Sequence, residues 1–311
     1  MDTEQQLGTQ QATQQQATRM RAAVAYRFGG PEAVRVEQRP TPTPRADELL
    51  VRVHASTVSI ADHRMRSRDL PEGLGFLGPI SLGVFRPRKP VLGMDVAGVV
   101  VAVGDEVTGF APGDEVIAMP ASVFGGHTAL AYLDKAGVGP GDEVLVNGAS
   151  GAVGTAAVQL AKQRGARVTA VCGPRNVELV RTLGADHVID YTTEDFTQNG
   201  ETYDAILDCV GNAPFDRVAD SITPGGALLL VITNLRSMLR ASRDSRRSGK
   251  LVTTSGAPVS HDRFAELSRL ADAGALRPVI DRTYDLDDIV EAHRYVDTGH
   301  KTGSVVLRIA E

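Results

Sequence analysis

The chain has 311 residues, 42% of them hydrophobic, which is enough for two domains of ordinary size with real cores. Its formal net charge of −5 and its pI near 5.8 argue against general binding to nucleic acid or anionic membranes, because both need a basic surface. No stretch approaches roughly eighteen apolar residues, so no membrane span is expected, and the only cysteines, Cys172 and Cys209, fit a reducing, cytoplasmic compartment better than a disulfide framework or a structural zinc site.

The first half of the chain is predicted to be a tail followed by a β domain. Residues 1–19 are rich in glutamine and lack the features of a signal peptide, so we expect a disordered tail, and translation could start at Met1 or at Met20. Residues 20–124 contain short valine-rich runs such as "ELLVRVHAS" and "MDVAGVVVAVG", separated by Gly and Pro. This pattern predicts strands of a sheet or barrel.

After this β domain the pattern changes to alternating strands and helices. Residues 125–258 contain buried-strand runs such as "DEVLVNG" and "YDAILDCVG" between helical segments, which predicts a parallel sheet with helices on both faces. Residues 259–311 read helix, strand, helix, strand, and are predicted to return to the first domain.

The stretch "VNGASGAVG" follows a predicted buried strand and opens a predicted helix. Gly151 and Gly154 have the spacing of the dinucleotide-binding turn, with Ala149 in place of its first glycine. Gly151 would let the backbone approach a pyrophosphate, Ser150 adds a hydroxyl, and the helix N-terminus favours an anion. The alternative interpretation is a tight turn with a purely structural role.

The second strand of this unit indicates which dinucleotide is bound. No Asp or Glu occurs between Thr155 and Val177, whereas an NAD site usually has an acidic residue there. Arg175 follows the strand directly, and a guanidinium–phosphate contact is worth roughly 1.5 to 3 kcal/mol. NADPH is therefore favoured over NADH; otherwise Arg175 is a solvated loop residue.

Several motifs in one order resemble a known family. "VLGMDVAGVVVAVGDEVTGFAPGDEV", "VNGASGAVGTAAVQLAKQRGARVTAVC" and "AHRYVDTGHKTGSVVL" are similar to the zinc-independent, quinone-oxidoreductase-like branch of the medium-chain dehydrogenase/reductase superfamily. The resemblance covers nearly all of the chain from Met20 onward. It implies an α/β Rossmann domain inserted into a GroES-like β-barrel domain, a homodimer, and hydride transfer from NADPH to a quinone, enone or other activated carbonyl.

The resemblance also implies roles for individual residues. Thr128 would face the nicotinamide and Lys301 would lie at the cleft. The cofactor's phosphates and adenosine would be contacted by Ser150, Gly151, Ala152, Val153, Gly173, Arg175 and Tyr191.

The metal ligands of zinc-dependent relatives are missing. The stretch "VSIADHRMR" lacks the ligand cysteine, and "GMDVAG" lacks the histidine of a "GHE" motif. A catalytic zinc needs three protein ligands, which Asp62 and His63 alone cannot supply, so no zinc is expected. Ser59 and Asp62 occupy the loop where the branch has an Asn-Pro-x-Asp pattern. They are catalytic or substrate-binding candidates, and the alternative is that they only cap the following helix.

One further departure concerns "GDEVIAMPASVFGGHTAL", where a few tens of residues present in relatives are missing near residues 119–123. This apparent deletion predicts an incomplete barrel with an exposed edge. It also keeps open a second function, an NADPH-binding sensor or partner-binding module with decayed catalysis. A third class, nucleic-acid binding, would use the basic run "LRSMLRASRDSRRSGK", but that run has no interleaved aromatics, which favours a solvated helix face.

Overall fold

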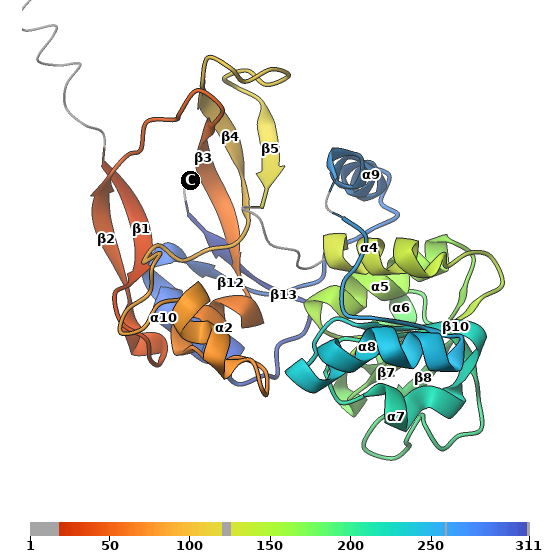
Figure 1. The fold of residues 1–311 in the computed structure, drawn as a ribbon. Coiled ribbons are helices and arrows are strands. Elements are labelled where there is room, and N and C mark those ends of the chain that lie inside the picture. Colours follow the sequence, from red (N-terminus) through yellow and green to blue (C-terminus); the bar gives the residue numbers. More distant parts are fainter. Residues whose placement is uncertain (1–18, 120–125, 259, 310–311) are drawn as a thin grey trace, which may run out of the picture.

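The computed structural model describes residues 19–119, 126–258 and 260–309, which form two domains lying side by side (Figure 1). The predicted tail at residues 1–19 lies outside these ranges except for Arg19. The predicted junction at residues 119–123 lies outside them except for Met119.

A parallel sheet forms the centre of one domain. Its strands, within residues 126–258, are β6 (Glu143–Asn147), β7 (Arg167–Cys172), β8 (His187–Asp190), β9 (Tyr203–Asp208), β10 (Ile222–Leu230) and β11 (Leu251–Thr253). Their order is β11-β10-β9-β6-β7-β8, and all neighbouring pairs are parallel. This is the strand order of a Rossmann domain, the fold predicted for this part of the chain. The direction of winding reverses between β6 and β9, where such sheets bind ligands at the carboxyl ends of the strands.

Helices cover both faces of this sheet, which explains the continuous apolar runs of its strands. Val144, Leu145 and Val146 of β6 are fully buried. The helices are α4 (Gly126–Ala136), α5 (Ala152–Gln163), α6 (Val177–Thr182), α7 (Phe215–Val218), α8 (Leu235–Ser248) and α9 (His261–Asp272). The α4, α5, α6 and α9 side chains join one hydrophobic core, and those of α7 and α8 join the other.

The position of α9 differs from the sequence-based boundary at residue 259. Leu267, Leu270 and Leu276 pack into the core formed by α4 and α5, so α9 belongs by packing to the Rossmann domain (Figure 1). An amphipathic pattern shows which face of a helix is buried, but not which domain buries it.

The second domain consists of two β-sheets and the helices that pack on them. Its strands are β1 (Arg19–Ala25), β2 (Val34–Pro40), β3 (Leu49–Val58), β4 (Val96–Val103), β5 (Glu115–Ala118), β12 (Ile280–Asp285) and β13 (Ser304–Arg308). Strands β1 and β2 pair with each other, and the other sheet has the order β12-β13-β3-β4-β5. Because Val305 of β13 pairs with Val58 of β3, the C-terminal segment returns to this domain.

The barrel is incomplete, as predicted. In the described parts of the chain the two sheets do not close, and β5 has a strand partner only on its β4 side. Ile117 of β5 is 67% exposed, which is high for a large aliphatic residue in a strand. Helices α2 (Ile60–Ser67), α3 (Gly78–Ser81) and α10 (Ile289–Asp297) complete this domain, and α10 packs against α2.

Candidate functional site

The glycine-rich turn connects β6 to α5 at the carboxyl edge of the Rossmann sheet. A methyl group on Gly154 would lie 2.2 Å from the carbonyl oxygen of Gly148, so this position tolerates only glycine and brings the helix close to the turn. Gly151 is the N-cap of α5 and supplies no side-chain cap. The first-turn amide groups of α5 therefore remain available to an anion.

The C-terminal segment that returns to the β-sheet domain contacts this turn. The amide of Gly303 donates to the carbonyl of Ser150 at 2.7 Å, and Gly303 forms a parallel bridge with Gly151. Lys301, half-buried, donates from Nζ to the carbonyl oxygen of Gly303 at 2.6 Å. Burial lowers the pKa of Lys301. Through Gly303, the structure thus brings Lys301 close to Ser150 and Gly151, which lie about 150 positions earlier in the chain.

A second group of predicted residues meets at the ends of β7 and β8. Gly173 follows β7, and a methyl group added to it would lie 3.2 Å from the hydroxyl of Tyr191, which follows β8. Tyr191 is 66% exposed and Arg175 is exposed. Arg175 has no hydrogen-bond or ion-pair partner among the described residues, so its guanidinium is available to a ligand.

A cleft of about 900 Å³ lies between the two domains. Val51, Val96 and Ile117 line it from the open sheet, and Ala152 and Thr155 line it from α5. The cleft thus reaches the first turn of the helix that would hold the pyrophosphate. Its mainly aliphatic lining suits an apolar substrate.

Two polar side chains at the start of α4 are buried and have no hydrogen-bond partner among the residues that the structure describes. Thr128 is 3% exposed and its hydroxyl has no hydrogen-bond partner in the described part of the chain. The same holds for both ring nitrogens of His127, which is 2% exposed and lines the cleft. Burial lowers the pKa of His127, which keeps its ring neutral. Sequence reasoning missed His127, because nothing in "GGHTAL" shows that this histidine is buried and unpaired.

Ser59 and Asp62 form the capping box at the start of α2. The Asp62 carboxylate accepts hydrogen bonds from the Ser59 amide and hydroxyl at 2.8 and 2.7 Å, and its other oxygen, Oδ1, has no partner in the described residues. Asp62 lines a cavity inside its own domain and is not among the residues of the interdomain cleft. The cap accounts for both residues structurally, and a role in catalysis remains a prediction.

His63 belongs to an ion-pair network. Its Nδ1 lies 2.7 Å from Asp297, which also accepts from Arg66 at 2.6 Å. Within residues 19–119, 126–258 and 260–309, the side chains of His, Cys, Asp and Glu form no group of three or more that could hold a metal ion.

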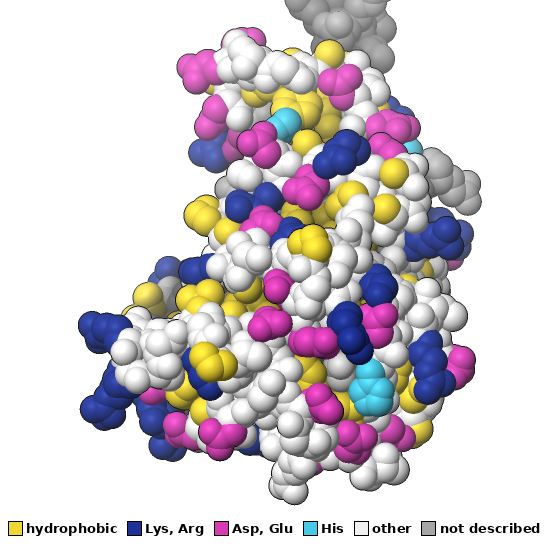
Figure 2. Space-filling view, turned by 90° about the vertical axis from the view of Figure 1, so that its right-hand side faces the viewer, with side chains coloured by type: hydrophobic (Ala, Val, Ile, Leu, Met, Phe, Trp, Pro, Cys, Tyr) yellow, Lys and Arg dark blue, Asp and Glu magenta, His cyan; other side chains and the backbone are white. Residues whose placement is uncertain are grey.

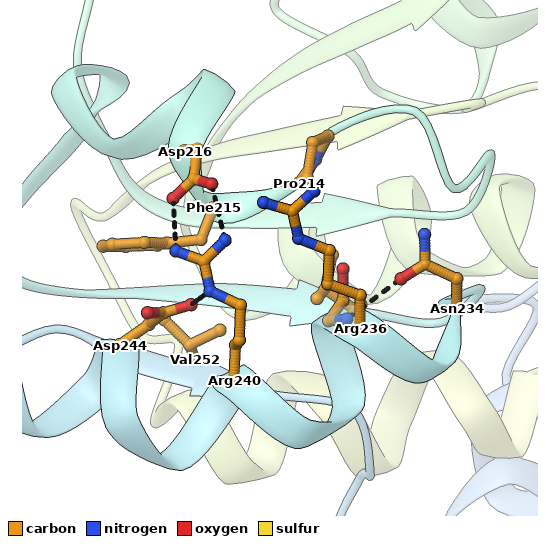
Figure 3. A pocket seen from close by; sticks show the side chains of 10 residues that line it. Pro214, Phe215, Asp216, Asn234, Arg236, Arg240, Asp244 and Val252 are labelled. Carbon is orange, nitrogen blue, oxygen red and sulfur yellow. Dashed lines mark hydrogen bonds and ion pairs between the residues drawn. The ribbon is translucent and has the colours of Figure 1, made fainter. Parts of the chain in front are cut away.

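The basic run predicted as a solvated helix face forms α8. Arg240 pairs with Asp216 at 2.9 Å, and Lys250 donates to the carbonyls of Ala219 and Ile222. Figure 3 shows Arg240 between Asp216 and Asp244 in a small pocket beside Arg236. On the face shown in Figure 2, acidic side chains lie among the basic ones. No helix within the described ranges is both long and apolar enough to cross a bilayer.

Two family models match the chain. One, described as the alcohol dehydrogenase GroES-like domain, matches residues 45–176, and the other, described as zinc-binding dehydrogenase, matches residues 183–307. Together they span the glycine turn, the sheet and the returning segment.

Curated relatives and solved structures agree with these matches. The chain is 31% identical to a chloroplastic quinone oxidoreductase of Triphysaria versicolor, covering 90% of this chain and 95% of the relative. It is also 31% identical to the mitochondrial NAD(P)H oxidoreductase RTN4IP1 of Mus musculus, covering 85% and 82%. A quinone oxidoreductase structure from Coxiella burnetii is 26% identical with a TM-score of 0.80, covering 94% and 100%.

The alignment with the Triphysaria relative contains gaps in this chain. It runs over 326 positions, whereas 90% of 311 residues is about 280, which leaves about 46 positions without a residue of this chain. A missing segment like the one predicted at residues 119–123 produces such a difference.

Proposed function

The chain belongs to the quinone-oxidoreductase-like branch of the medium-chain dehydrogenase/reductase superfamily and is an NAD(P)H-dependent oxidoreductase, and from this premise we propose that it uses NADPH, without zinc, to reduce a quinone, enone or other activated carbonyl. The names of the relatives support the reaction class. The substrate class and the choice of cofactor are our proposal.

The residues at the carboxyl edge of the sheet fit a dinucleotide phosphate. The uncapped first turn of α5, with Ser150 and Gly151 before it, suits the pyrophosphate. Arg175, Gly173 and Tyr191 would hold the adenosine 2′-phosphate, because Arg175 is exposed and lacks a partner among the described residues. The fit is also steric, since Gly154 packs the helix against the turn without a side chain between them.

The chain's own residues would orient the substrate and exclude water from the cleft. When bound, the nicotinamide supplies the hydride. The Thr128 hydroxyl, which has no partner among the described residues, follows His127 directly in the chain, and the His127 ring lines the cleft. The neutral His127 ring can donate one hydrogen bond to a developing oxyanion. The aliphatic walls formed by Val51, Val96 and Ile117 would accept an apolar ring.

The observation that carries the proposal is Arg175, which is exposed and has no hydrogen-bond or ion-pair partner within the described ranges. It lies two residues after Gly173, and the preceding strand carries no acidic residue. A homodimer that acts on a small molecule remains our expectation from the family resemblance, and a cytoplasmic location remains our expectation from the cysteine usage. Neither nucleic acid nor membrane is part of this proposal.

The experiment compares thermal unfolding with NADPH, with NADH and without nucleotide. We expect NADPH to raise Tm more than NADH at equal concentration, because the tighter ligand stabilises the folded state more by mass action. Arg175→Ala should lower NADPH affinity roughly ten- to a hundredfold, and should erase most of the difference. Arg181→Ala, which removes an arginine paired with Glu178 on the next helix, is the control. A wild-type preference for NADH would refute the choice of cofactor.

Turnover and metal dependence are measured on the same preparation. NADPH oxidation with a panel of quinones and enones tests the substrate class. Activity that survives a chelator is expected, and activity lost to chelator but restored by zinc would overturn the zinc-independent part of the proposal.

A further inference from the structure

The β domain, which contains β1–β5, β12 and β13, holds a second, partly open cavity that is separate from the proposed cofactor site. It has a volume of about 590 Å³ and is lined by strands of both sheets and by α10, with Ala23, Val53, Val101, Leu307 and Ile289 among its walls. Such a volume lies in the range of small-molecule sites, which are mostly apolar with a few polar groups. An ordinary protein interior would fill this space with side chains.

Two buried polar side chains face this apolar space without a full set of partners. Asp62 is 2% exposed and its Oδ1 has no hydrogen-bond partner among the described residues. His293 of α10 is 1% exposed and its Nδ1 also has none there. An unpaired buried polar atom costs roughly 1 to 3 kcal/mol, so a ligand that pairs with it gains affinity.

A second carboxylate of this cavity already has hydrogen-bond partners. Asp95 also lines the cavity, and its carboxylate accepts from the Thr57 amide at 2.7 Å and from the Thr57 hydroxyl at 2.6 Å. Burial, followed by the charge of Asp95, raises the pKa of Asp62 despite the Ser59 hydrogen bonds. Burial lowers the pKa of His293 to about 4. The cavity therefore favours a neutral polar group.

We propose that this cavity is a binding site for an apolar molecule with a single hydroxyl group, of the size of an alkylphenol, whose hydroxyl pairs with Oδ1 of Asp62. A hydroxyl both donates and accepts, so it can pair with a carboxylate oxygen or an imidazole nitrogen, whichever proton that group carries. The aliphatic walls take the rest of the molecule. This site differs from the interdomain cleft, although the two cavities share Val51, Val53 and Val96 as a common wall.

The test uses two probes that differ in one hydrogen-bond donor, 4-hexylphenol and 4-hexylanisole. Each is titrated calorimetrically into the full chain. The phenol should bind at least about tenfold more tightly, because the aryl ether cannot donate to Oδ1 and its oxygen is only a weak acceptor if Oδ1 carries a proton. Equal affinities for the two probes would overturn the proposal.

Two substitutions place the site. Asp62→Asn keeps an amide oxygen for the Ser59 cap and turns an N–H toward the cavity, so the preference for the phenol should disappear or reverse. Val101→Phe fills this cavity only and should abolish binding of both probes while leaving NADPH affinity unchanged.

The matched control narrows the other cavity. Ala265→Phe, on the exposed side of α9, reaches only the interdomain cleft and should leave phenol binding intact. Loss of binding in Ala265→Phe with retention in Val101→Phe would move the phenol to the interdomain cleft and refute the site. If Asp62→Asn does not fold, the Val101→Phe and Ala265→Phe pair still decides between the two locations.

Discussion

The two domains differ in how much they depend on the segment predicted to be missing near residues 119–123. The Rossmann sheet is parallel and covered by helices on both faces, and its central strand β6 is buried from Val144 to Asn147. In the β domain most neighbouring strands are antiparallel. Its strand β5 alternates exposed and partly buried residues and lies at an open edge of the sheet. A layered sheet keeps its core when a neighbouring domain is shortened, whereas a barrel needs each of its strands to enclose its interior.

The comparison also separates the two kinds of site. The groups predicted to hold the cofactor lie on the complete domain, apart from Lys301 and the returning segment. The interdomain cleft and the cavity lined by Asp62 and His293 both have walls formed by the β domain. Binding of the nucleotide and efficient catalysis can therefore be altered independently, and the following substitutions test this.

The largest effect is expected at the glycine turn. Gly154→Ala would place a methyl carbon 2.2 Å from a backbone oxygen, which should lower the free energy of unfolding by roughly 3 kcal/mol. Gly151→Ala has its nearest contact at 3.5 Å and a φ of −78°, so its stability should stay near wild type while NADPH affinity falls. Urea denaturation and nucleotide titration measure the two quantities. Similar stability losses in both variants would contradict the steric account.

The next effect concerns His293 on α10 of the β domain, where protonation at low pH should reduce the free energy of unfolding. Burial, then the charge of Arg66, and a smaller contribution from His63 lower the His293 pKa to about 4, while Asp297 opposes them. As pH falls below 6.5, His293 becomes protonated in the unfolded chain, whereas in the folded chain it stays neutral until about pH 4. The free energy of unfolding should therefore fall by about 3 kcal/mol across this window from this residue alone.

His293→Gln should remove that part of the pH dependence between pH 7 and pH 4. His187→Gln, which replaces an exposed histidine on β8 of the Rossmann domain, is the control and should leave the pH profile unchanged. Denaturant unfolding at several pH values supplies the comparison, and parallel profiles for wild type and His293→Gln would show that the buried ring does not govern acid stability.

The smallest effect concerns catalysis. Inserting a family-like segment after Met119 should raise turnover at least about tenfold, or ~1.4 kcal/mol in the barrier, because a closed cleft fixes the substrate and excludes water. NADPH affinity should change little, since the glycine turn and Arg175 lie beyond the junction. Vigorous quinone or enone reduction by the unmodified chain would show that the missing segment is dispensable.

Much of the local geometry at the proposed cofactor site could be predicted from the sequence. The strand–glycine–helix pattern placed Ser150, Gly151 and Gly154 at a turn, and the structure shows the close packing that the pattern implies. The absence of acidic residues before Arg175 is likewise readable directly. These features are local because a turn and the ends of adjacent parallel strands are set by short stretches of chain.

The partners of α9, His127 and Asp62 could not be predicted in the same way. The sequence shows that α9 is amphipathic, but only packing against α4 assigns it to the Rossmann domain. His127 and Asp62 resemble many polar residues until the fold buries them. Among the described residues, both ring nitrogens of His127 and Oδ1 of Asp62 then have no hydrogen-bond partner. The hydrophobic periodicity and the residue spacing thus determined which segments form helices and strands, and where the glycine turn lies. The tertiary structure decided what each buried face meets, because burial and hydrogen-bond pairing depend on residues far away in the chain.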